Sequence, residues 1–145
     1  MPKMLGMIEK ILSGKLQQPP VARLIGFRLT YIKKGKAIIE FESSERHTNP
    51  MGTLHGGILC DIADAAMGLA YASTLEEGES FTTLELKINF LKPVWKARLK
   101  TIGKVVKKGR TISFTECDVI DEKKNLVARA TSTCMTLRDE QAQGR

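Results

Sequence analysis

Aromatic residues are scarce in this sequence, at 6% of its 145 residues, and they are not interleaved with its basic turns. A surface that binds single-stranded nucleic acid needs such interleaving, because bases stack on aromatic rings. No segment resembles a helix-turn-helix. The formal net charge of +7 still indicates an anionic partner, and this charge alone is compatible with nucleic acid, a membrane surface or a phosphate-rich small molecule. We predict no nucleic-acid partner.

Cysteine is also rare. Cys60, Cys117 and Cys134 are odd in number, widely spaced and set in apolar or strand-like surroundings. They therefore indicate neither a disulfide framework nor a zinc site. This usage fits a reducing compartment, so we expect a cytoplasmic protein that binds no metal.

Long apolar runs are missing from the start of the chain. Residues 3–13 place apolar residues at helical spacing with charged residues between them, which predicts a short amphipathic helix. The segment lacks the apolar core of a signal peptide and is shorter than the ~20 residues that cross a bilayer. We expect neither secretion nor a membrane partner, and we expect this helix to cap an edge of the sheet.

Alternating apolar and polar residues are the main pattern that the sequence does contain, and they predict half-buried strands. The expected strands occupy residues 27–31, 37–42, 83–90, 97–106, 111–120 and 126–137. The side chains expected on the inner faces of the first and the third strand are Phe27, Leu29, Tyr31, Leu84, Leu86, Ile88 and Phe90. With a single long helix and no alternation of strand and helix, the sequence predicts an α+β fold. No repeat or linker divides residues 1–145, so we expect one domain with a core at about 26–137.

The segment from His47 to Ala70 combines a polar loop, a glycine pair and the long apolar helix, which we expect to end near Leu75. Only Asp61 and Asp64 interrupt the apolar run of this helix. Asp61 lies in its first turn, where the helix dipole stabilises an acid. Asp64 lies beyond that turn, and a carboxylate buried there needs a compensating partner or a function. Asp64 is therefore the candidate for chemistry.

Gly56 and Gly57 stand where the helix begins. Without side chains they let a ligand approach the free N–H groups of the helix start, which can stabilise a carbonyl oxygen as it becomes an oxyanion. Such a site is suited to acyl transfer. The glycines alone are equally compatible with a tight turn into the helix.

The pattern Asn49-x-x-Gly52-x-x-His55-Gly56-Gly57, followed by Asp64, resembles the signature of the PaaI-type acyl-CoA thioesterases of the hotdog fold. The resemblance extends over about residues 26–137. It implies one long central helix wrapped by a five- to six-stranded antiparallel sheet, plus the short N-terminal helix. It also implies hydrolysis of acyl-CoA without a cofactor, since coenzyme A is part of the substrate, and a homo-oligomer, either a dimer or a tetramer built as a dimer of dimers.

The resemblance also implies roles for individual residues. Asp64 corresponds to the general base or nucleophile, and Gly56, with Gly57 as a second donor, to the N–H that polarises the thioester carbonyl. Asn49 corresponds to a residue that orients the carbonyl or the water, and Thr83 to a hydroxyl residue that supports the water. Asn49 and Gly56 are expected from one subunit, Asp64 and Thr83 from its partner.

The basic turn after the fourth expected strand corresponds to a turn that lies near the nucleotide end of coenzyme A in the family. Its residues are Lys107, Lys108, Gly109, Arg110 and Thr111. Their charges are expected to pair with the 3′-phosphate or the pyrophosphate, and the glycine to let backbone N–H groups approach.

Two alternatives remain open. Hotdog hydratases and dehydratases act on acyl thioesters with a histidine and an acid, and His55 with Asp64 resembles that pair. The position of His55 directly before the glycines favours a different role, a hydrogen bond that holds the loop. The other alternative is a non-catalytic acyl-CoA binding protein. The sequence does not choose among aromatic, medium-chain and long-chain acyl groups, and His47 has no evident role beyond the loop.

Overall fold

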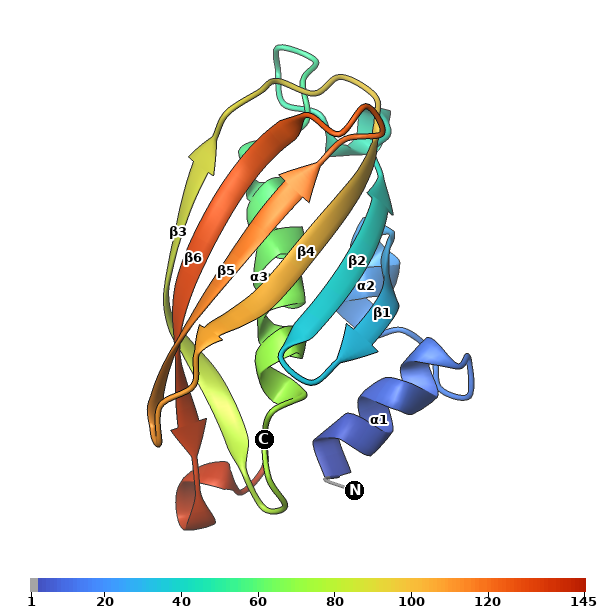
Figure 1. Cartoon of the computed structure of the whole chain (residues 1–145). Helices are drawn as coiled ribbons and strands as arrows, with labels where there is room; N and C mark the ends of the chain where they lie inside the picture. The colour runs from blue at the N-terminus through green and yellow to red at the C-terminus, as the bar shows by residue number, and fades with distance from the viewer. Residues whose placement is uncertain (1–2) are drawn as a thin grey trace.

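The computed structural model describes residues 3–145 and shows six antiparallel strands curled around one long helix (Figure 1). The elements are α1 (Lys3–Leu12), α2 (Pro20–Ile25), β1 (Phe27–Lys33), β2 (Lys36–Glu42), α3 (Gly56–Ala72), β3 (Ser80–Phe90), β4 (Arg98–Lys107), β5 (Ile112–Ile120) and β6 (Leu126–Leu137). Short 3₁₀ helices occupy Glu45–His47 and Asp139–Ala142. The order in the sheet is β1-β2-β4-β5-β6-β3. The predicted α+β class, central helix and antiparallel sheet are confirmed.

Small residues allow α3 to lie directly on the sheet. Its buried side includes Ala63, Ala66 and Ala70, which are fully inaccessible. A Cβ atom added at Gly103 of β4 would lie 2.4 Å from the Ala66 carbonyl oxygen, so only glycine fits there. This contact sets the distance between helix and sheet. The same helix face carries Ile62 and Met67 into the core, also at 0% exposure, which is the apolar burial that holds the fold together.

Bulges change which side chains face the helix in two strands. In β1 the register shifts between Leu29 and Tyr31, so Tyr31 turns outward, 40% exposed, although the sequence pattern placed it inside. In β3 the shift falls between Thr83 and Glu85, and Leu84 is 54% exposed rather than buried. A bulge adds one residue to a strand and reverses the alternation beyond it.

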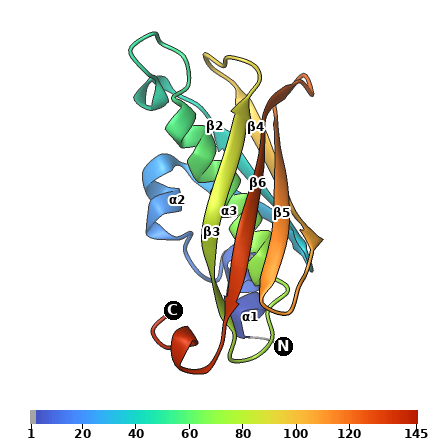
Figure 2. The same ribbon diagram turned by 90° about the vertical axis from the view of Figure 1, so that its left-hand side faces the viewer.

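Helix α2 was not predicted from the sequence, and it begins at a proline, Pro20. Proline is well placed at the first turn of a helix, where its missing N–H has no partner to lose. The helix ends at Gly26, whose φ of 97° gives a left-handed cap with its N–H bonded to the Ala22 carbonyl. Helix α2 lies on the same side of the sheet as α3 (Figure 2), and α1 packs against β1 and α3.

Candidate active site

Asp64 and Thr83 come together from α3 and β3. Both line one groove, and the Thr83 hydroxyl lies near enough to the carboxylate to favour its charged form. The bulge after Thr83 helps to keep this residue on the inner face, where it also lies 4.0 Å from the Cys134 sulfur. The structure thus brings together the two residues that the resemblance assigned to the same subunit.

The expected burial of Asp64 is wrong for one copy of the chain. The residue is exposed, as is Asp61 one turn earlier. The reason is that the sheet covers only the side of α3 that carries Ile62 and Ala66, while the two acids lie on the other side. The helix is therefore not surrounded by its own chain.

The pKa of the Asp64 carboxyl is nevertheless raised above its ordinary value of 3.8. Desolvation beside the apolar groove is the main cause, and the negative charge of Asp61 adds to it. The hydrogen bond from Thr83 opposes the shift by favouring the charged form. A raised pKa makes a carboxylate a stronger base, and groups with such shifts cluster at functional sites.

The start of α3 is organised by His55, whose Nδ1 accepts the Gly57 N–H at 2.9 Å. This hydrogen bond is the holding role expected of His55. It also occupies the Gly57 N–H, which was expected to be a second donor to the carbonyl. Within residues 3–145 the Gly56 N–H has no acceptor, so it is the free donor of the pair. The Phe90 ring lies over Gly56: an added Cβ would meet its Cζ at 2.9 Å.

Asn49 uses its side chain to close the loop before α3. Its Oδ1 accepts the N–H groups of Met51 at 3.0 Å and Thr53 at 3.2 Å, and its Nδ2 donates to the Thr53 hydroxyl at 2.7 Å. Asparagine often closes turns in this way. In this conformation the carboxamide shapes the loop that leads to Gly56, and one N–H of its Nδ2 is left for another partner.

Gly56 and Asp64 cannot act on the same atom within one copy of the chain. They are eight residues apart on α3, which corresponds to about 12 Å along the helix axis. A carboxylate side chain is too short to bridge that distance. The proposed donor and the proposed base therefore require two copies of the chain to meet.

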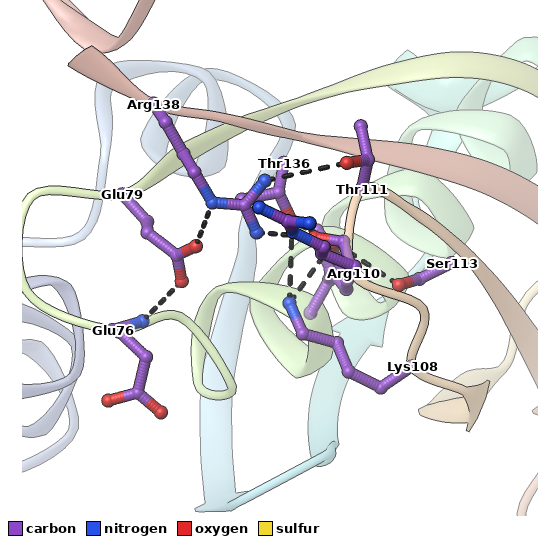
Figure 3. Close-up of polar contacts among 9 residues, drawn as sticks. Glu76, Glu79, Lys108, Arg110, Thr111, Ser113, Thr136 and Arg138 are labelled. Carbon is purple, nitrogen blue, oxygen red and sulfur yellow. Dashed lines mark hydrogen bonds and ion pairs between the residues drawn. The ribbon is translucent and has the colours of Figure 1, made fainter.

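The basic turn lies at the other end of α3 from Gly56. Lys108 is directed inward, where its Nζ lies 3.2 Å from the buried Tyr71 hydroxyl and 3.4 Å from the Thr136 hydroxyl (Figure 3). The Gly109 N–H donates to the Ser113 hydroxyl at 3.0 Å. Lys108 and Gly109 thus hold the turn in place. The Gly109 N–H was expected to approach a phosphate, but it is not free because it already donates to Ser113.

Arg138, the residue directly after β6, supports the same turn. Its guanidinium pairs with Glu79 at 2.8 Å and donates to the Arg110 carbonyl (Figure 3). It also lies 3.5 Å from the Thr111 hydroxyl. Lys107, Lys108 and Arg110 are all exposed. The Lys108 ammonium contacts Tyr71 and Thr136, which leaves Lys107 and Arg110 as the charges of the turn most open to an anionic ligand.

Sequence reasoning missed the role of His47. Its side chain is buried, with Nε2 2.7 Å from the Ile25 carbonyl oxygen and Nδ1 accepting the Ser44 N–H at 3.0 Å. It joins the loop before α3 to the end of α2. Since α2 was not predicted, the sequence offered no partner for this ring.

Other kinds of site are not found in the described part of the chain. Residues 3–145 contain no group of three or more metal-ligating side chains, and no helix among them is long and apolar enough to span a membrane. All three cysteines are free thiols.

Comparison with known proteins now adds to this geometry. Residues 51–128 match the family model described as the thioesterase superfamily. The chain belongs to the thioesterase superfamily. A predicted esterase of Saccharolobus solfataricus is 35% identical over 118 residues, covering 81% of this chain and 84% of the relative. Human acyl-coenzyme A thioesterase 13 is 26% identical over 117 residues, with coverages of 79% and 83%.

Solved structures lead to the same group. A mutant of the phenylacetic acid degradation protein PaaI from Thermus thermophilus has a TM-score of 0.75 at 25% identity, covering 81% of this chain and 98% of that one. The thioesterase is thus of the PaaI type with the hotdog fold, and it is a thioester hydrolase. The family favours hydrolysis over the hydratase alternative, and His55 is already engaged as a helix cap.

The raised pKa of Asp64 predicts the acidic limb of the pH profile. A carboxylate must be ionised to act as a base. If Asp64 has this role, kcat/KM should fall as the pH drops through its raised pKa, at a higher pH than for an ordinary aspartate. Asp61→Asn removes the like charge and should move the limb to lower pH. Steady-state pH profiles of the Asp61→Asn variant measure this shift. The control is Glu140→Gln, which makes the same charge change at an exposed C-terminal residue. Equal profiles for the two variants would contradict an effect of Asp61 on Asp64.

Proposed function

We propose that this thioesterase hydrolyses acyl-CoA, with Asp64 as the general base or nucleophile. The observation that carries the proposal is the pairing of Asp64 with Thr83 at the edge of an apolar groove, where the carboxylate has a raised pKa. A thioester carbonyl placed there would need a donor for its developing negative charge, and the free Gly56 N–H at a helix start is suited to this role.

The reaction follows from these groups. In the first route Asp64 takes a proton from water, and the water oxygen attacks the carbonyl carbon. The C–S bond then breaks, and the proton on Asp64 passes to the leaving thiolate, so that thiol and acid are released and the carboxylate is restored. In the second route the carboxylate attacks the carbonyl carbon, the C–S bond breaks to expel the thiolate, and water then hydrolyses the resulting anhydride. Thr83 holds the carboxylate or the water in either route. Both routes require the ionised form of Asp64.

The active unit of this proposal is a homodimer. Among the described residues, β3 pairs on one side only, with β6, so its other edge is open. An open edge of 11 residues with exposed Leu84 and Phe90 is suited to pairing with the same strand of a second copy about a two-fold axis. Such a dimer can bring Gly56 of one copy to Asp64 of the other, as the helix spacing requires. A tetramer would join two of these dimers.

Lys107 and Arg110 are proposed to pair with the phosphates of coenzyme A. Their charges are exposed, whereas Lys108 and Arg138 are engaged in holding the turn. The net charge of +7 on the whole protein favours an anionic substrate such as a coenzyme A ester. A cytoplasmic location remains a prediction from the free thiols.

Asp64→Asn tests the function directly. The change keeps the shape of the side chain and removes its charge, so kcat for acyl-CoA should fall about 100-fold to 10,000-fold. Release of free thiol from a panel of acyl-CoA esters measures this. Asp139→Asn, the same change at an exposed C-terminal residue, should retain wild-type rates. Retention of most activity by Asp64→Asn would refute the assignment.

The oxyanion donor can be removed without a large change at the helix start. Gly56 is the first residue of α3, where proline is favoured, and the extended backbone of His55 suits a following proline. Gly56→Pro removes the N–H and should lower kcat about 100-fold to 1,000-fold relative to Gly56→Ala. The alanine variant makes the same Cβ contact with Phe90 and keeps the N–H. Equal rates for the two would show that this N–H does not assist the reaction.

Mixing the two defective chains tests the shared site. A heterodimer of Asp64→Asn and Gly56→Pro has one site with both functional groups intact and one with both removed. Subunit exchange at equal concentrations should therefore restore about a quarter of wild-type activity from two nearly inactive preparations. A site contained within one chain gives no recovery after exchange, which native mass spectrometry can verify independently.

A further inference from the structure

A groove of about 290 Å³ begins at Asp64 and Thr83 and runs beneath the N-terminal helix. Helix α1 forms its roof with Met4, Met7, Ile8 and Ile11. Two hydrogen bonds hold this roof to the body. The Lys3 N–H donates to the Glu77 carboxylate at 3.1 Å, and beyond the helix the Leu29 N–H donates to Gln18 Oε1 at 3.3 Å.

The floor of the groove consists mostly of small residues on α3. Ala65, Gly68 and Ala72 line it, together with Leu69. A Cβ atom at Gly68 would lie 3.5 Å from the Phe81 ring, an ordinary contact, so packing does not require glycine there. Glycine inside a helix is destabilising relative to alanine. What the missing side chain provides is open volume between the helix and the roof.

Polar groups are confined to a few positions along this groove. Gln18, Asp64 and Thr83 are its only polar side chains within residues 3–145. The Gln18 carboxamide oxygen already accepts the Leu29 N–H. Beyond the reacting end, the groove therefore offers little to a hydroxyl group of a substrate and presents apolar carbon along its length. The two methionines of α1 add flexible side chains that adapt to an alkyl chain.

The length of the groove sets the size of the chain that fits. It follows α3 from Asp64 to Ala72, eight residues or about 12 Å. An extended chain advances about 1.2 Å per bond, so this length matches about ten carbons.

We infer that this groove is the acyl subsite and that α1 is the element that selects the acyl group: an unbranched saturated chain of about eight to ten carbons. The inference rests on the proposed function, because it places the thioester carbon beside Asp64. It goes beyond that function in assigning the substrate class and the residues that choose it.

A chain-length series tests the substrate class. Each added methylene buried in the groove should raise kcat/KM about fourfold up to about ten carbons, after which the gain should stop. The probes are the butyryl, hexanoyl, octanoyl, decanoyl and palmitoyl esters of coenzyme A, with 4-hydroxybenzoyl-CoA as the polar aryl competitor. A flat profile, or a preference for the hydroxybenzoyl ester, would overturn the inference.

Two variants test the groove itself. Gly68→Leu adds a side chain to the floor of the groove, and Met7→Trp places a larger side chain in its roof, so both narrow it. Either variant should lower the ratio of kcat/KM for decanoyl-CoA to that for butyryl-CoA at least tenfold. Leu12→Trp lies on α1 outside the groove and should leave the ratio unchanged. Circular dichroism checks folding, and Met7, 44% exposed, can change without disturbing the core. An unchanged ratio in a folded Met7→Trp protein would place the chain elsewhere.

Binding to the Asp64→Asn variant separates this inference from the catalytic assignment. The groove predicts that decanoyl-CoA binds this variant at least tenfold more tightly than butyryl-CoA, as calorimetry can measure. Equal affinities would refute the groove even if Asp64→Asn is inactive. Tighter decanoyl binding by an Asp64→Asn protein that still hydrolyses thioesters would support the groove and reject Asp64 as the base.

Discussion

Helix α3 lies so close to β4 that the backbone at Ala66 fills the space where a side chain of residue 103 would be. This contact fixes the helix on the inner side of the sheet and determines which of its faces stays uncovered. Ile62 and Met67 enter the core, while Asp61 and Asp64 are left on the opposite side. A carboxylate is thereby held on a rigid element beside apolar surface, which raises its pKa without burying it completely.

The same helix separates the proposed oxyanion donor from the proposed base. At the start of the helix, His55 accepts the Gly57 N–H and leaves the Gly56 N–H free. Its middle carries Asp64, two turns further on, and its end is tied to the basic turn through Tyr71 and Lys108. Since the helix is rigid, no local motion can bring its start to its middle. If Gly56 and Asp64 act as proposed, activity is therefore a property of an assembly of chains.

Much of the fold could be predicted from the sequence because strand alternation and helix periodicity are local signals. The strands and the long helix were found, and the resemblance around Asn49 and Asp64 identified the family. The bulges at Leu29 and Thr83 were not found, because pairing with a neighbouring strand decides where an extra residue is accommodated.

The parts of the site that sequence reasoning missed depend on contacts between distant segments. The inward direction of Lys108 requires Tyr71 and Thr136. The role of His47 requires the end of an unpredicted helix. The groove forms because α1 lies beside α3, and the periodicity of residues 3–13 does not indicate which surface that helix packs against. The exposure of Asp64 likewise follows from the curvature of the sheet rather than from its neighbours in sequence.

The pairing of β3 with β6 has a consequence for the order in which the protein can form. Thr83 lies opposite Cys134, 51 residues later. During synthesis on the ribosome, the strand that carries this hydroxyl has no hydrogen-bonded neighbour until nearly the whole chain has been made. Strand β3 must therefore stay without its β6 partner while the earlier hairpin of β1 and β2 is already able to form. Loss of a few residues from β6 would thus leave the part of β3 that carries Thr83 without its hydrogen-bonded neighbour.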